Sequence, residues 1–248
     1  MALTAPLARA SKIERDAEMI RVRRTRRQFA IPKVNSIGIL IFDDVEELDF
    51  VGPLEVFGMA VRLRKSGNVT IVAHKRKVVR CRHGLKVVAQ ALIPKRKPFD
   101  LLIVPGGLGA RTHALKNEKI LEYVSRHEGM IASVCTGALI LGAAGLLKNQ
   151  KVTTHHSAFN LLRRYSGLVV RKGLRMTANE RIWTSAGISA GIDMSLALVS
   201  ALWGERLSHR VANALEWSER THPSKVVELA RIGEHTDDML PKFLGARR

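Results

Sequence analysis

The segment 130–147 decides the fold of this 248-residue chain and reads MIASVCTGALILGAAGLL. Its first five residues form a short apolar run, which is typical of a buried strand. The small apolar residues from Gly137 to Leu147 suit a helix buried inside protein. Cys135 stands between the two elements, so the sequence predicts a strand, a sharp turn at this cysteine and a helix.

Short apolar runs and helical segments alternate on both sides of this segment. Strands are expected at 37–42, 69–73, 101–104 and 182–185, and an antiparallel ribbon is expected around 87–89. Helices are expected at 48–63, 118–128 and 187–203. Short strands that alternate with helices imply a mostly parallel central sheet covered on both faces, so the fold class is α/β.

The two ends of the chain differ from this middle part. Residues 1–35 include the basic cluster RVRRTRR at 21–27, and we expect them to form a basic arm, mobile or helical. Acidic residues in the arm argue against a transit peptide. The domain is expected over 36–220, followed by a C-terminal helix and tail over 221–248.

Charge is the unusual property of the composition. The formal net charge is +19, and the stretch 62–97 contains no Asp or Glu. A basic face of this kind attracts polyanions in a salt-dependent way. It is also compatible with a plain solvated surface, because no recognition motif marks a nucleic-acid reader.

Two cysteines, Cys81 and Cys135, are too few for a disulfide framework. A reducing, cytoplasmic location is therefore expected. No apolar run reaches the roughly 18 residues that a membrane span needs, so no membrane association is expected. No Cys/His cluster has zinc-finger spacing, so no metal site is predicted.

Cys135 is the residue best placed for chemistry. At the start of a helix, the helix dipole and free N–H groups stabilise a thiolate. The carboxyl end of a strand is also where open α/β sheets bind ligands. Gly107, in the Pro-Gly-Gly turn after another strand, and Thr136 have N–H groups that can meet developing negative charge. The alternatives are a buried structural cysteine and an ordinary turn.

Five blocks of sequence resemble the DJ-1/PfpI superfamily, the class I glutamine amidotransferase-like proteins, in the expected order. They are IGILIFDDVEELDFVGP at 37–53, DLLIVPGG at 100–107, the segment 132–147, KVTTH at 151–155 and TSAGISAGID at 184–193. The resemblance implies a flavodoxin-like sandwich with a cysteine nucleophile elbow, usually a homodimer.

Within this family the chain is most similar to isonitrile hydratases and to the amidotransferase-like domain of some AraC-type regulators. The first likeness implies hydration of a small molecule, an isonitrile, to an N-substituted formamide. It assigns Cys135 as the nucleophile and Asp49 as the acid/base, with Thr136 orienting water or substrate. It implies no metal or organic cofactor.

Other interpretations of these residues stay open at this point. Asp49 could cap its helix, and Asp193 is expected to cap a later one. His155 and Gly106 are expected to contact the catalytic residues rather than the substrate. Cys135 could serve redox sensing without turnover, or the domain could be a sensor related to AraC-type regulators.

Overall fold

The computed structural model describes residues 33–217, apart from residues 76 and 95–98. Most of the expected basic arm and the whole expected C-terminal helix and tail lie outside the described residues. Val34, which the sequence assigned to the arm, is 1% exposed and packs in the core. Its carbonyl accepts a hydrogen bond from the Trp203 indole at 3.3 Å, so this segment is part of the domain.

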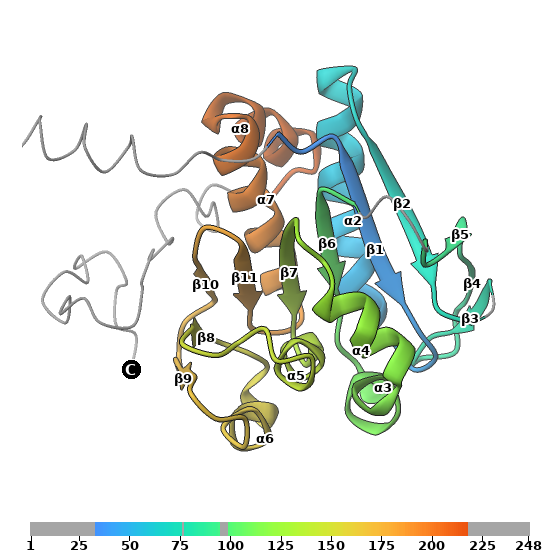
Figure 1. Ribbon diagram of the computed structural model, residues 1–248. Coiled ribbons are helices and arrows are strands. Elements are labelled where there is room, and N and C mark those ends of the chain that lie inside the picture. Colours follow the sequence, from blue (N-terminus) through green and yellow to red (C-terminus); the bar gives the residue numbers. More distant parts are fainter. Residues whose placement is uncertain (1–32, 76, 95–98, 218–248) are drawn as a thin grey trace, which may run out of the picture. The chain divides into compact units, whose positions relative to one another are not determined.

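A seven-stranded sheet forms the centre of the domain (Figure 1). Its strand order is β10-β11-β7-β6-β1-β2-β5. The strands are β1 (Ser36–Ile41), β2 (Asn68–Ala73), β5 (Ala91–Leu92), β6 (Leu101–Val104), β7 (Met130–Val134), β10 (Met176–Ala178) and β11 (Ile182–Ser185). All neighbours pair in parallel except β10 with β11. The expected mostly parallel sheet is confirmed.

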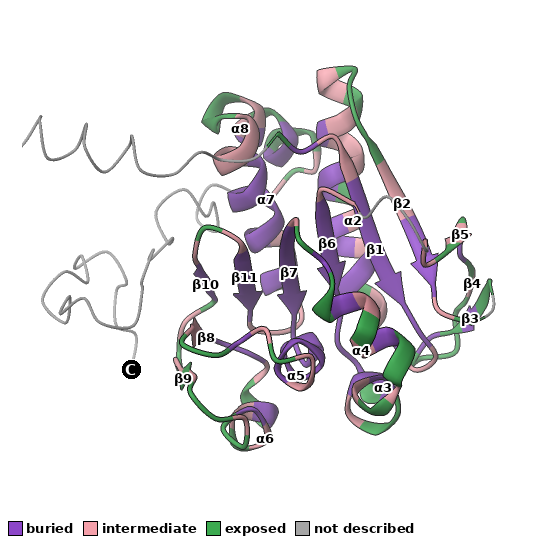
Figure 2. Cartoon of the chain, in the orientation of Figure 1, coloured by how far each residue is buried: buried purple, intermediate pink, exposed green. Residues whose placement is uncertain are grey.

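Helices cover both faces of this sheet, as the α/β sandwich requires (Figure 1). One group consists of α2 (Glu47–Arg64), α7 (Ala190–Trp203) and α8 (Glu205–Ala214), which contact one another. The other group contains α3 (Leu108–Thr112), the 3-10 turn η1 (Ala114–Lys116), α4 (Glu118–Ser125) and α5 (Gly137–Ala143). Strands β6, β7 and β11 are buried along their whole length because both of their faces are covered (Figure 2).

Short elements complete the domain. Strands β3 (Val78–Arg80) and β4 (Lys86–Val88) pair antiparallel, which confirms the expected ribbon. Strands β8 (Lys151–Val152) and β9 (Val169–Val170) pair in parallel, and η2 (His156–Ala158) leads into α6 (Phe159–Leu162). No helix among the described residues combines the length and the apolar character needed to cross a membrane.

Two expected elements are shorter than the sequence indicated. The helix expected to reach Leu147 ends at Ala143, because Gly145 adopts a φ of 77° that turns the chain. The block KVTTH at 151–155, which resembles the family's strand after the cysteine segment, is a strand only at Lys151–Val152. Beyond it, the Thr153 N–H donates to the Thr184 hydroxyl at 2.8 Å.

Candidate active site

Cys135 lies in the sharp turn between β7 and α5. Its φ of 56° is in the left-handed region, which non-glycine residues rarely adopt. Its N–H donates to the carbonyls of Ser185 and Ala186, at 3.2 and 3.3 Å, and its carbonyl accepts from the Thr154 hydroxyl at 2.6 Å. These contacts hold the turn from both sides and leave Cys135 6% exposed.

Asp49 lies in the first turn of α2 and is fully buried. Its Oδ2 accepts a hydrogen bond from the Gly106 N–H at 3.0 Å, whereas the buried Oδ1 has no hydrogen-bond partner. Glu46 occupies the N-cap position of α2, but its side chain makes no capping hydrogen bond. The alternative of Asp49 as a helix cap is therefore wrong, since its carboxyl is directed to the Pro-Gly-Gly turn.

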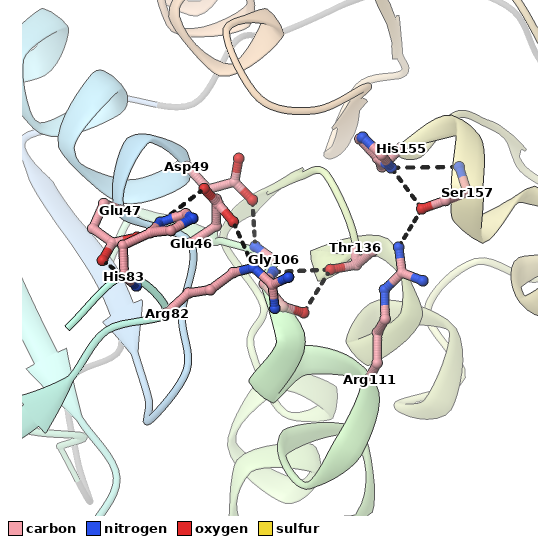
Figure 3. Close-up of polar contacts among 11 residues, drawn as sticks. Glu46, Glu47, Asp49, Arg82, His83, Gly106, Arg111, Thr136, His155 and Ser157 are labelled. Carbon is pink, nitrogen blue, oxygen red and sulfur yellow. Dashed lines mark hydrogen bonds and ion pairs between the residues drawn. The ribbon is translucent and has the colours of Figure 1, made fainter.

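The hydroxyl of Thr136 is engaged with the same turn (Figure 3). It accepts from the Gly107 N–H at 2.9 Å and donates to the Gly107 carbonyl at 3.1 Å. The Gly107 N–H, which was expected to meet negative charge on the substrate, therefore has a hydrogen-bond partner within the protein. Gly106 must be glycine here, because a Cβ would lie 2.5 Å from the Thr136 nitrogen and 2.9 Å from Asp49 Oδ2.

The pKa values of both reactive groups are raised, mainly by burial. Burial raises the pKa of Asp49 to about 8 with a contribution from Glu46, although hydrogen bonds from Gly106 and Cys135 oppose the change. Burial and Asp49 also raise the pKa of the Cys135 thiol, although hydrogen bonds from Thr136 oppose the change. The sequence predicted a stabilised thiolate at the helix start, but desolvation outweighs the helix terminus. At neutral pH the thiol and the carboxyl are both protonated.

Gly187 brings Cys135 and His155 together. A Cβ on Gly187 would lie 2.7 Å from Cys135 Sγ and 2.8 Å from His155 Cδ2. The sulfur and one edge of the imidazole therefore border the same small space. His155 was expected behind the reacting groups, and the structure places its ring beside the sulfur.

A chain of hydrogen bonds fixes the orientation of His155 (Figure 3). The Arg111 guanidinium donates to Ser157 Oγ at 2.5 Å, and that hydroxyl is 2.7 Å from His155 Nδ1. The Ser157 N–H also donates to Nδ1, at 3.4 Å. Because Nδ1 is an acceptor, the neutral ring carries its proton on Nε2, next to the Cδ2 edge that borders the sulfur. No local sequence pattern marked Arg111, which lies in the short helix α3, or Ser157, which lies in the single turn η2.

We expect Gly187→Ala to close the space beside the sulfur. The added methyl collides with Cys135 and His155, so alkylation of Cys135 by iodoacetamide should slow at least about tenfold, and stability should fall by about 1–3 kcal/mol. Mass spectrometry of the intact protein measures the alkylation rate. Gly58→Ala is the matched control, because a Cβ at Gly58 of α2 meets nothing within 4 Å. Equal alkylation rates in both variants would contradict this geometry.

Among the described residues, one group has metal-ligand spacing and consists of Glu46, Glu47 and His83. These side chains already pair with one another, since His83 Nδ1 lies 2.8 Å from Glu47 Oε2. Arg82 Nε lies 3.6 Å from Glu46 Oε2. The contacts fasten the β3–β4 turn to the start of α2, the helix that carries Asp49 (Figure 3).

Asp193 has a different role from the one expected. It lies in the first turn of α7 but makes no cap, because the N-cap residue is Ser189. Its carboxylate pairs with Arg175 Nε at 2.5 Å and accepts from the Trp217 indole at 3.1 Å. It therefore joins the residue just before β10, α7 and the segment after α8, and the expectation of a cap is wrong.

Comparisons with known proteins agree with this architecture. A profile of the DJ-1/PfpI family matches residues 35–201. The isonitrile hydratase of Pseudomonas putida is 31% identical over 207 residues, which are 79% of this chain and 88% of that protein. A THiJ/PfpI family protein from Pseudomonas syringae superposes with a TM-score of 0.69 at 28% identity, covering 78% of this chain and 79% of that one.

An AraC family transcriptional regulator from Pseudomonas putida has the same fold. Its TM-score is 0.65 at 23% identity, covering 73% of this chain and 98% of that one. Fold, sequence and the order of the five blocks agree along most of the described residues. The chain therefore belongs to the DJ-1/PfpI family.

Proposed function

We propose that this protein is a cofactor-independent hydratase that converts an isonitrile to an N-substituted formamide, with Cys135 as nucleophile and Asp49 as acid/base. The observation that carries the proposal is the state of the Asp49 carboxyl. One oxygen is held by Gly106, the other is buried without a hydrogen-bond partner, and the carboxyl as a whole interacts with the Cys135 thiol. The likeness to the Pseudomonas putida isonitrile hydratase supports the same reaction.

The first step needs no free thiolate. Because Oδ2 accepts the Gly106 N–H, the acid proton of Asp49 resides on Oδ1, the unpartnered oxygen. Asp49 gives this proton to the terminal carbon of the isonitrile and takes the thiol proton, while the sulfur of Cys135 bonds to that carbon. The product is a thioimidate, and Asp49 is again a neutral acid.

The second step adds water to the C=N bond of the thioimidate. Asp49 takes a proton from the water and returns its own proton to the substrate nitrogen, which leaves a tetrahedral adduct. Collapse of this adduct breaks the C–S bond, forms the formamide carbonyl and returns a proton to the sulfur. The sum is one isonitrile and one water converted to one formamide, so no redox agent or cofactor is required.

Thr136 and His155 have distinct supporting roles in this scheme. The Thr136 hydroxyl fixes the Gly106–Gly107 turn and therefore the carboxyl of Asp49. The backbone N–H of Thr136 is directed to the sulfur and stabilises negative charge there during C–S cleavage. The neutral Nε2–H of His155 donates to the substrate or to the sulfur without protonating either.

The test is incubation of the purified protein with a panel of alkyl and aryl isonitriles, with formamide followed by mass spectrometry. Turnover is expected, and it should be greatest for isonitriles whose terminal group is unhindered. A folded protein whose Cys135 reacts with iodoacetamide but which forms no formamide would overturn the proposal.

We expect Arg111→Met to move the acid limb of the pH–rate profile. Burial, His156 and Arg111 lower the pKa of His155, so removing the guanidinium raises this pKa. His155 then becomes protonated at higher pH, and the acid limb of kcat/KM should move up by about half a pH unit. Formamide formation between pH 5 and 9 measures this shift. Arg206→Met, an exposed substitution on α8, is the control that should leave the profile in place.

The redox-sensing alternative has less support. Sensor cysteines combine a low pKa with solvent access. Cys135 is 6% exposed and its pKa is raised. The AraC-type sensor alternative rests on the shared fold and on 26% identity over 182 residues to one transcriptional regulator, of which this chain spans 49%. The homodimer, the cytoplasmic location and polyanion binding by the basic face stay predictions.

A further inference from the structure

The two flanks of the candidate active site differ in charge (Figure 3). On one flank Glu46 lies near Asp49, and Glu46 Oε2 is paired with Arg82 Nε at 3.6 Å. Arg111 lies on the other flank, and in the part of the chain that the structure describes no carboxylate pairs with it. The mechanism above uses Arg111 only to hold and tune His155, so the free charge of Arg111 is available for a ligand.

The fold gives the Arg111 side chain a defined position close to the site. Arg111 lies in α3, four residues after Gly107, and is partly buried. The start of α3 is fixed to the loop after β1, because the Gly109 N–H donates to the Asp44 carbonyl at 2.9 Å. At its other end the guanidinium is fixed by Ser157 Oγ at 2.5 Å.

Most of the hydrogen-bonding capacity of Arg111 is unused within the protein. A guanidinium has five N–H groups arranged in a planar fork. One of them, on Nη2, donates to Ser157, and across residues 33–217, apart from the short gaps, the other four have no hydrogen-bond partner. A fork of this kind matches the two oxygens of a carboxylate, which it binds through parallel hydrogen bonds.

The electrostatic surroundings of His155 are positive on this flank. Burial lowers the pKa of His155, His156 and Arg111 lower it further, and no carboxylate of the described domain opposes them. His156 is exposed, and its ring centroid lies 4.1 Å from that of His155. An anion is therefore attracted to the flank that carries Arg111, whereas Glu46 repels it from the opposite flank.

The guanidinium is near enough to the sulfur for one small molecule to reach both. Cys135 Sγ and His155 Cδ2 both lie within 2.8 Å of the point that a Cβ on Gly187 would occupy. From the far edge of the imidazole, two hydrogen bonds through Ser157 lead to the guanidinium, so the whole separation is on the order of 10 Å. We propose, building on the proposed hydratase, that the preferred substrate is an isonitrile with a carboxylate on a short alkyl chain, and that Arg111 binds this carboxylate.

The test compares 4-isocyanobutanoate and 6-isocyanohexanoate with their methyl esters, which have a similar shape and no charge. At pH 7, kcat/KM for formamide formation should be roughly 10–100-fold higher for the acids, as expected for hydrogen bonds between charged groups. Arg111→Met should bring the ratio of acid to ester close to one. Arg111→Lys should keep part of the ratio, since the charge remains without the fork. Arg82→Met is the matched control and should leave the ratio unchanged, because Arg82 is already paired with Glu46.

The ratio of acid to ester separates carboxylate binding from the other effects of Arg111. A change in His155 or in folding alters the rates of acid and ester alike, so it cancels in the ratio. If the unmodified protein hydrates the esters as fast as the acids, the hydratase stands and this proposal is refuted.

A second measurement does not depend on turnover. The formamide product 4-formamidobutanoate should slow the alkylation of Cys135 by iodoacetamide, and its methyl ester at the same concentration should not. Arg111→Met should abolish this protection. Protection by the acid in a protein that hydrates no isonitrile would refute the hydratase and support the anion site. Equal protection by acid and ester, or none at millimolar concentration, would rule out the anion site.

Discussion

Replacing Cys135 by alanine will abolish formamide formation, with a fall in kcat of at least about 10³-fold. In the proposed mechanism the sulfur is the atom that bonds to the isonitrile carbon, and Asp49 interacts with no other thiol among the described residues. The backbone strain at φ 56° is the same for alanine, and the lost atom is small, so the variant should fold. Formamide quantified by mass spectrometry, together with a circular dichroism melt, separates lost chemistry from lost structure.

Cys81→Ala is the matched control for this experiment. Cys81 is also a free and buried cysteine, and burial with Glu47 and Asp43 raises its pKa to about 11. The Cys81→Ala protein should keep its activity, because the hydrogen bonds of Cys81 with the described residues stay within the β3–β4 turn and reach neither Cys135 nor Asp49. A Cys135→Ala protein that still forms formamide, with the Cys81→Ala protein inactive, would reverse the assignment.

Asp49→Asn should lower the rate by about 10²–10⁴-fold, since the amide cannot exchange protons. In the proposed mechanism the acid form of Asp49 is the active one, and burial raises its pKa to about 8. The rate should therefore fall as the pH rises through about 8. Rates measured from pH 6 to 10 test this limb, and a rate that increases steadily through this range would contradict Asp49 as the acid.

The same substitution should change how stability depends on pH. The folded pKa of Asp49, about 8, lies above its ordinary value of 3.8, so the folded state binds the proton more tightly. This contribution is complete below pH 3.8 and is lost as the pH rises to about 8. Asp49→Asn should remove that decline, which urea unfolding at pH 5 and 8 measures. Parallel declines in both proteins would show that other groups cause it.

The sequence predicted the fold well where a continuous apolar run corresponds to a strand that is buried on both faces. The runs at 101–104 and 130–134 are buried on both faces, so continuous apolar sequence identified them as strands with the observed bounds. Cys135 and Asp49 were identified by their places at a strand end and in a family motif. Both positions depend on local sequence and on the order of elements along the chain.

The remaining parts of the site depend on contacts across the fold. Thr136 and Gly107 are 29 residues apart, and their hydrogen bonds occupy groups that the sequence left free. Arg111 reaches Ser157 across 46 residues, and no local pattern marks either one. The pKa of Cys135 depends on how completely the fold removes water, which outweighs the helix terminus that the sequence did indicate.

Gly187 decides how much of the Cys135 sulfur its own strand-to-helix segment leaves uncovered. A methyl group on residue 187 would lie 2.7 Å from Cys135 Sγ and 2.8 Å from His155 Cδ2, so only the hydrogen of glycine fits there. Any larger side chain at this position would cover the sulfur and displace the imidazole, which makes residue 187 a determinant of access although it carries no functional group.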